Sequence, residues 1–181
     1  MSRAVLSIGS NLDDRLAALC GAVDAFRPWL VAVSPVYETP PWGPVAQEDY
    51  LNAVLIVSDA EAGARDWLRR AQDAEQRAGR TRELRWGPRT LDVDVITVDD
   101  EVSSAAELTL PHPRAVERAF VLVPWLAADP QATLAGRPLA DWLDRLPQDD
   151  VAGVRRLEIA GPKGGAAEVG SAFRWWVGRR T

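Results

Sequence analysis

The residues best suited to chemistry lie together in the segment RTRELRWGPRTLDVD, residues 80–94. Arginines stand at positions 80, 82, 85 and 89, and an alternating run that follows them carries Asp92 and Asp94. Side chains two apart in a strand point to the same face, so these carboxylates should lie side by side. The planar guanidinium group can donate two parallel hydrogen bonds to phosphate oxygens, and carboxylates bind the Mg²⁺ that bridges such oxygens. The pattern indicates a site for a polyphosphate with magnesium.

A purely structural explanation of the same residues stays open. Lys163 is the only lysine among the 21 basic residues, so arginine is abundant everywhere and any local arginine count is inflated. An Asp-x-Asp pair is also common on the solvated face of a strand, and short patterns of this kind are weak by themselves.

The composition is that of an ordinary globular chain, and 181 residues predict a single domain. A net charge of −5 gives no reason to expect binding to nucleic acid or to a membrane surface. Cys20 is the only cysteine and His112 the only histidine, which excludes an internal disulfide and a zinc site rich in these residues. No signal peptide, membrane span or Walker A pattern is found. We expect a cytoplasmic monomer.

Apolar periodicity predicts an alternation of strands and helices. Strands are expected at residues 4–8, 30–38, 50–57, 90–98 and 108–110. Helices are expected at about residues 12–26, 60–78, 115–127 and 139–146. Ser10 or Asn11 can cap the first helix, and Gly79 is placed to end the second. Pro35 makes its strand an edge strand or a bulged one, and Pro124 should interrupt or bend the third helix.

This order of elements favours an α+β fold, with helices covering a mixed or antiparallel sheet. A doubly wound parallel fold is less compatible, because the chain has no Gly-x-Gly-x-x-Gly turn.

Several ordered blocks of the sequence are similar to one known family. They are SIGSNL at 7–12, YETPPWGP at 37–44, DYLNAV at 49–54, RWGPRTLDVDV at 85–95, LTLPHPR at 108–114 and ERAFVLVPW at 117–125. They resemble the 6-hydroxymethyl-7,8-dihydropterin pyrophosphokinase family over about residues 4–146, and the arginine–aspartate block is the most specific of them.

The resemblance implies a ferredoxin-like three-layer α-β-α sandwich with a mainly antiparallel sheet. It also implies transfer of pyrophosphate from ATP to the hydroxymethyl group of the pterin, with release of AMP, in folate biosynthesis. The expected partners are these small substrates and a pair of Mg²⁺ ions. The catalytic domain should cover residues 1–160, which leaves a tail of unknown role at 161–181.

The roles of individual residues follow from the resemblance position by position. Catalytic positions are Arg80, Arg89, Asp92 and Asp94, of which Asp92 and Asp94 also bind the metal. ATP positions are Gln72, Glu75, Arg82, Arg85, Val95, Leu108, Thr109, His112 and Arg118. Pterin positions are Thr39, Pro40, Trp42, Tyr50, Asn52, Trp86 and Phe120.

The sequence also departs from the usual pattern of the family. Trp42 stands where many members carry leucine, and Val116 stands near a position that is often lysine. The second difference removes a cation near ATP, so Arg118 and the arginines of 80–89 should carry more of the phosphate binding.

Two other functions compete with this interpretation. A magnesium-dependent nucleotidyl- or glycosyltransferase would use the same aspartate pair, but it leaves Tyr50, Asn52 and Phe120 without a role. A non-catalytic ferredoxin-like module would bind ATP without releasing AMP. Taken singly, Tyr50 and Phe120 could also be core aromatics, and Trp42 and Trp86 could belong to a protein interface.

Overall fold

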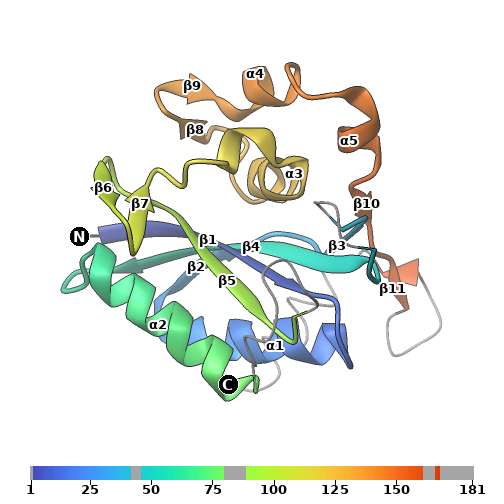
Figure 1. Cartoon of the computed structure of the whole chain (residues 1–181), viewed down its shortest axis with the longest axis horizontal. Helices are drawn as coiled ribbons and strands as arrows, with labels where there is room; N and C mark the ends of the chain where they lie inside the picture. The colour runs from blue at the N-terminus through green and yellow to red at the C-terminus, as the bar shows by residue number, and fades with distance from the viewer. Residues whose placement is uncertain (1, 42–45, 80–88, 161–165, 168–181) are drawn as a thin grey trace.

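An antiparallel sheet of six strands organises the chain (Figure 1). The computed structural model describes residues 2–41, 46–79, 89–160 and 166–167. The strands of the sheet are β1 (Ser2–Ser10), β2 (Leu30–Val33), β3 (Tyr37–Thr39), β4 (Tyr50–Asp59), β5 (Asp92–Val98) and β10 (Arg155–Arg156). Their order is β10-β3-β4-β1-β5, and β2 also pairs with β4.

The connections between these strands give the ferredoxin-like arrangement. Helix α1 (Arg15–Phe26) follows β1 and helix α2 (Ala64–Arg77) follows β4. Because β2 and β3 both pair with β4 and act as one interrupted strand, the chain runs β-α-β-β-α-β through its first 98 residues. The central strands β1 and β4 pair along their whole length, from Ser2 opposite Asp59 to Ser10 opposite Leu51. Every pairing within this sheet is antiparallel. The predicted α+β class and ferredoxin-like sandwich are confirmed.

Helices cover both faces of the sheet, and each face has its own apolar core (Figure 1). Side chains alternate along β1, so Leu6 and Ile8 pack toward α1 and α2 while Val5 packs toward the other face. That other face is covered by α3 (Ala119–Ala128), which follows the short helix η2 (Ala115–Glu117).

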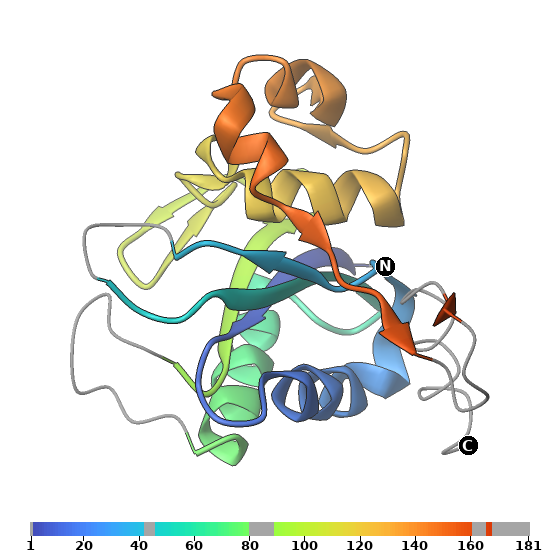
Figure 2. The same ribbon diagram turned by 90° about the vertical axis from the view of Figure 1, so that its right-hand side faces the viewer.

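Smaller elements complete the described part of the chain. They are η1 (Arg27–Trp29), the hairpin β6 (Ser103–Ala105) and β7 (Leu108–Leu110), the hairpin β8 (Thr133–Leu134) and β9 (Arg137–Pro138), the helices α4 (Leu139–Leu143) and α5 (Gln148–Ala152), and the pair β11 (Ile159–Ala160) and β12 (Ala166–Ala167). After α5 the chain returns to the sheet and adds β10 beside β3; in Figure 2, β10 is the first of the two orange arrows that follow the orange helix.

Some boundaries differ from the sequence-based predictions for local physical reasons. The predicted strand 30–38 is two strands, β2 and β3, separated around Pro35, which cannot donate to a ladder. Asp14, and not Ser10 or Asn11, caps α1, because its Oδ1 accepts a hydrogen bond from the backbone N of Ala17 at 3.0 Å. The predicted helix 115–127 breaks at Arg118 and continues through Pro124.

None of the helices within the described ranges is long and apolar enough to cross a membrane.

Candidate active site

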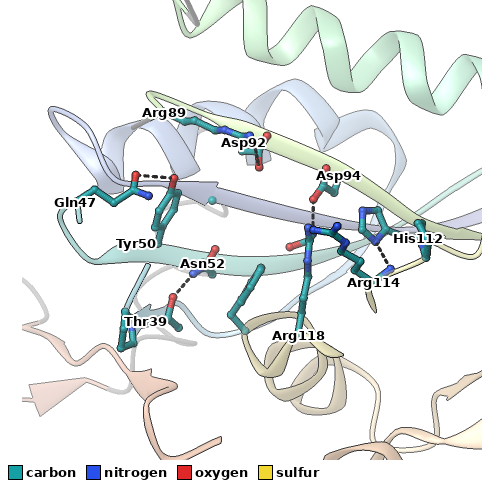
Figure 3. Close-up of a pocket in the computed structure, with 15 residues that line it drawn as sticks. Thr39, Gln47, Tyr50, Asn52, Arg89, Asp92, Asp94, His112, Arg114 and Arg118 are labelled. Carbon is teal, nitrogen blue, oxygen red and sulfur yellow. Dashed lines mark hydrogen bonds and ion pairs between the residues drawn. The ribbon is translucent and has the colours of Figure 1, made fainter. Parts of the chain in front are cut away.

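A cavity of about 380 Å³ opens on the α3 side of the sheet (Figure 3). Residues from the two central strands, from β5, from the end of β3 and from the start of α3 form it, together with the segments after β3, before β5 and after β7. Its lining consists of Ser7, Gly9, Thr39, Pro40, Gln47, Tyr50, Asn52, Arg89, Asp92, Asp94, His112, Pro113, Arg114, Arg118 and Phe120.

Strand register builds the floor of the cavity as two adjacent rows. One row places Gly9 between Asn52 of β4 and Asp92 of β5, and the next places Ser7 between Val54 and Asp94. The central position of the first row therefore has no side chain. Gly9 leaves open the space between an amide and a carboxylate.

This half of the sheet is open because α3 covers the other half. Val5, Val54 and Ile56 belong to the apolar cluster under α3, and Ile96 continues that cluster on β5. Farther along the same face, the strands carry Ser7, Asn52 and the aspartates instead. The change from apolar to polar residues along one face places the cavity at the end of the smaller core.

One end of the cavity combines aromatic rings with an amide. The Asn52 side chain is buried, and its Nδ2 donates to Thr39 Oγ1 at 2.6 Å. Tyr50 lies beside it and donates through its hydroxyl to Gln47 Oε1 at 3.4 Å. Phe120 lines the same cavity from the start of α3. Rings supply apolar area and an amide supplies donor and acceptor positions, which is the combination that a flat, polar-edged ring needs.

The other end is charged, with each aspartate paired to its own arginine (Figure 3). Arg89 contacts Asp92, and Arg118 Nη1 lies 2.9 Å from Asp94 Oδ2. Burial acts to lower the pKa of Arg89, but the attraction and hydrogen bond of Asp92 outweigh it and raise that pKa. Each carboxylate on this mostly apolar strand therefore has a charged partner. Arg114 also lines this end of the cavity, beside the two arginine–aspartate pairs.

His112 is fixed beside this charged end. Its backbone N donates to Ile96 O at 2.8 Å, and its ring Nδ1 accepts from the backbone N of Arg114 at 3.2 Å. Burial lowers the pKa of the imidazole below 6.5; Asp94 opposes this shift and Arg118 adds to it. This environment favours the neutral imidazole, in which Nδ1 is engaged as an acceptor.

The two carboxylates that line the cavity suit a Mg²⁺ ion that binds together with the phosphate oxygens of a substrate. Among the residues that the structure describes, no group of three or more His, Cys, Asp or Glu side chains is arranged to hold a metal. Mg²⁺ commonly takes one or two carboxylates and completes its octahedron with water and phosphate oxygens. Asp92 and Asp94 can supply that share.

The structure brings together about half of the residues predicted for the site. Those that line the cavity are Thr39, Pro40, Tyr50, Asn52, Arg89, Asp92, Asp94, His112, Arg118 and Phe120. Trp42, Arg80, Arg82, Arg85 and Trp86 lie outside the described residues.

The remaining predicted positions do not line the cavity. Gln72 is exposed on α2, and Glu75 is buried there with its Oε1 accepting from the backbone N of Val93 at 2.9 Å. Val95 and Leu108 are buried in the larger core. Thr109 lies on β7, where its hydroxyl donates to Ala105 O at 3.2 Å. These residues stand behind or beside β5, and their predicted contact with ATP stays a prediction.

Sequence reasoning did not assign five lining residues to the site. They are Ser7, Gly9, Gln47, Pro113 and Arg114. Ser7 and Gly9 alternate along β1 in register with the aspartates, but that register is visible only once β1 is known to pair with β5. Arg114 belongs to the block LTLPHPR, and its positive charge beside His112 could have indicated a phosphate-binding residue.

The fold and the cavity fit an α+β enzyme of the phosphotransferase class. The profile of the family described as 7,8-dihydro-6-hydroxymethylpterin-pyrophosphokinase (HPPK) matches residues 5–130. The chain belongs to this family.

Named relatives agree with the family profile. A 2-amino-4-hydroxy-6-hydroxymethyldihydropteridine pyrophosphokinase of Mycobacterium tuberculosis is 50% identical over 168 residues, covering 86% of this chain and 89% of the relative. The protein of the same name from Mycobacterium leprae is 53% identical over 158 residues, covering 81% and 82%. That from Methylorubrum extorquens is 40% identical over 162 residues, covering 87% and 100%.

Solved structures support the fold alone, because their sequences are distant. A crystal structure of Plasmodium falciparum HPPK-DHPS with pteroate has a TM-score of 0.66 at 9% identity and covers 88% of this chain. A crystal structure of HPPK-DHPS in complex with substrates has a TM-score of 0.67 at 9% identity and covers 91%. This chain spans about half the length of each, at 48%.

Proposed function

We propose that this chain transfers the pyrophosphoryl group of ATP to 6-hydroxymethyl-7,8-dihydropterin in folate biosynthesis, and that the reaction takes place in the cavity described above. The products are AMP and the pterin diphosphate. Membership of the family carries the activity. The observation that supports the location is a single cavity with an amide–aromatic end and an arginine–carboxylate end.

The pterin is assigned to the amide–aromatic end. Tyr50 and Phe120 provide ring surfaces, and Asn52 is held in place by Thr39 at 2.6 Å. An amide that is already buried and oriented can pair with a ring edge without first losing side-chain entropy. A ligand that lacked the matching edge would leave this buried amide unpaired, which favours a specific heterocycle. Trp42 and Trp86 remain predicted members of the same pocket.

The triphosphate is assigned to the charged end. Arg89, Arg114 and Arg118 line it together with His112. Arginine is suited to this role because its planar fork binds two phosphate oxygens at once. Arg80, Arg82 and Arg85 are predicted to add to this set.

The transfer joins the hydroxymethyl oxygen to the β-phosphorus and breaks the bond from that phosphorus to the oxygen shared with the α-phosphorus. AMP leaves with that oxygen, and the hydroxyl proton passes to an acceptor, for which we assign the carboxylate of Asp94. Charge spreads over the phosphoryl oxygens during such a transfer, so positioning and electrostatic stabilisation supply most of the acceleration.

Asp92 and Asp94 are the residues that would hold Mg²⁺, with a pair of ions as the expectation. Bound Mg²⁺ neutralises and orients phosphate oxygens. In the structure both carboxylates are paired with arginines, so metal binding would release Arg89 and Arg118 toward the phosphates.

The product of one assay distinguishes the competing functions. Protein, ATP, Mg²⁺ and hydroxymethyldihydropterin are incubated together, and the nucleotides are separated by chromatography. Pyrophosphoryl transfer gives AMP that depends on the pterin. A nucleotidyltransferase would release pyrophosphate instead, and a binding module would leave ATP intact. AMP that forms equally well without pterin would contradict the proposal.

A matched pair of variants tests the assignment of the cavity. Asp94→Asn keeps the shape of the side chain and removes its charge, so we expect at least about a hundredfold loss of turnover with the fold retained. Asp100→Asn changes an exposed aspartate just beyond the same strand and should keep full activity. Equal turnover in the two variants would place the chemistry elsewhere.

A further inference from the structure

Asn11 has a position that capping of α1 does not explain. It lies between β1 and α1, it is only 3% exposed, and it does not line the cavity. Asp14 already caps the helix, so the Asn11 side chain is available for other contacts.

The Asn11 amide joins two segments that are far apart in sequence. Its Oδ1 accepts from the backbone N of Arg89 at 2.8 Å, and its backbone N donates to Arg89 O at 3.1 Å. Its Nδ2 donates to Gln47 Oε1 at 2.9 Å and to Glu48 O at 3.0 Å. The reversed amide would set an oxygen against two acceptors, so this network fixes its orientation.

Each of these segments belongs to a different end of the cavity. Arg89 lines the charged end and contacts Asp92 through its side chain. Gln47 lines the other end, and its Oε1 accepts both from Asn11 and from the Tyr50 hydroxyl. A continuous chain of polar contacts therefore runs from Asp92 through Arg89, Asn11 and Gln47 to Tyr50.

We propose that Asn11 is a positioning residue that couples nucleotide binding at the charged end to pterin binding at the amide–aromatic end. The inference rests on the proposed function. A nucleotide that draws Arg89 toward its phosphates also fixes the Asn11 amide, which in turn fixes Gln47 and Tyr50. The pterin then meets a pocket that is already ordered and binds more tightly. The same linkage requires the pterin to tighten nucleotide binding by an equal factor.

The test measures a ratio of affinities. Pterin is titrated calorimetrically with and without a saturating Mg²⁺ complex of an ATP analogue whose α–β bridging oxygen is replaced by methylene. In the wild type we expect the analogue to tighten pterin binding at least about fivefold, the lower range of measured allosteric couplings. Asn11→Ala should bring this ratio close to one. A uniform loss of affinity from a loosened fold cancels in the ratio.

Two further variants make the outcome specific. Gln47→Ala removes the link on the pterin side alone, and it should lower the ratio as Asn11→Ala does. The double variant should add little, because both changes interrupt one chain of contacts. Gln76→Ala removes an exposed carboxamide from α2, and it should keep the ratio of the wild type.

The proposal is overturned if the wild type shows no coupling, or if Asn11→Ala and Gln47→Ala both keep its ratio. If Asn11→Ala lacks a cooperative unfolding transition, Gln47→Ala decides the matter alone. A wild type that forms AMP from pterin and ATP while these variants keep full coupling would refute only the role of Asn11. A wild type that binds no pterin would refute the proposed function itself.

Discussion

Gly9 is the residue that keeps the floor of the cavity open. A Cβ atom at this position would lie 2.6 Å from Asn52 Oδ1 and 3.6 Å from Tyr50 Cδ1. The first distance is well inside van der Waals contact, so Asn52 would have to move, although Thr39 holds it at 2.6 Å. The absence of a side chain at Gly9 therefore sets the position of the amide.

Gly9→Ala should separate binding from folding. We expect pterin affinity to fall by about tenfold or more, equivalent to about 1.4 kcal/mol, while affinity for the ATP analogue changes little. The added methyl displaces the buried Asn52 but leaves both apolar cores intact, so the free energy of unfolding should fall by no more than about 1–3 kcal/mol. Titration of each ligand and urea unfolding measure these quantities.

Gly21→Ala is the matched control for that substitution. A Cβ at Gly21 would meet nothing within 4 Å, and the residue lies inside α1, where alanine is the better helix former. This variant should be more stable by up to about 1 kcal/mol and should bind pterin as the wild type does. A Gly9→Ala protein that kept full pterin affinity would show that Asn52 moves freely.

His112 should make the free energy of unfolding fall as the pH is lowered below 6.5, because its environment favours the neutral imidazole. Burial lowers its folded pKa below 6.5, so the unfolded chain binds the proton more readily. The contribution of the neutral ring is complete above pH 6.5 and is lost as the pH falls from there toward the folded pKa. Urea unfolding between pH 8 and pH 5 should therefore show a steeper loss for the wild type than for His112→Gln. Parallel curves would mean that the imidazole is not desolvated.

At the scale of elements, β5 carries both aspartates at the edge of the sheet and relies on α2 for support. Glu75 of α2 is buried, and its Oε1 accepts from the backbone N of Val93, which lies between Asp92 and Asp94. An edge strand exposes backbone donors, and an unpaired buried donor is costly. Glu75 therefore holds the strand from behind the cavity.

Substitutions of Glu75 can distinguish this structural role from the predicted contact with ATP. Glu75→Ala should lower the free energy of unfolding by about 1–3 kcal/mol, because the Val93 N–H is left without its partner. Glu75→Gln keeps an acceptor oxygen and should recover most of that loss. If Glu75→Gln is stable but binds the ATP analogue poorly, Glu75 contacts the nucleotide as the family resemblance implies.

The sequence predicted the elements well where the signal is local. Alternation along 90–98 placed Asp92 and Asp94 on one face, and Gly79, with a φ of 73°, ends α2 as expected. The pairing of Arg118 with Asp94 could not be predicted from the residues themselves, because it joins positions 24 apart through tertiary packing. The same holds for Asn11, whose local pattern suggested a helix cap while its partners come from two distant segments.

Elements near the end of the described chain escaped prediction for a related reason. Helix α5 and strand β10 are short, and Arg155 and Arg156 have no apolar alternation to mark a strand. Their place is set by pairing with Tyr37 and Glu38 of β3, which lie more than a hundred residues earlier. Periodicity carries no information about such a contact.

At the scale of the whole molecule, one face of the sheet carries the larger apolar core and the other face carries the binding cavity. The larger core, between the sheet and α1 and α2, contains the fully buried Trp67, Phe26 and Leu6. The smaller core under α3 covers only part of the opposite face and leaves the remainder to the cavity. Substitutions in the cavity can therefore alter ligand binding while the larger core keeps the protein folded.

Strand β10 extends the catalytic domain toward the C-terminus. It closes the edge of the sheet beside β3. Arg155 Nη2 lies 3.6 Å from Glu38 Oε2 and 3.3 Å from Asp49 Oδ2. The backbone N of Leu157 donates to Val36 O at 2.9 Å. β3 also carries Thr39, which holds Asn52. The segment up to residue 160 therefore supports the pterin end of the cavity.

Two truncated proteins test this boundary. A chain that ends after Ala160 should keep the stability, pterin affinity and AMP-forming activity of the full chain, because it retains β10 and Leu157. A chain that ends after Ala152 loses the pairing with β3 and should lose pterin affinity more strongly than nucleotide affinity. Its free energy of unfolding should fall by about 1–3 kcal/mol, since a few backbone hydrogen bonds and one packed leucine are removed. Ligand titration and urea unfolding of both proteins provide the comparison. If the chain ending after Ala160 already loses pterin affinity, the catalytic domain extends beyond residue 160. If the chain ending after Ala152 keeps its pterin affinity, β10 does not support the pocket.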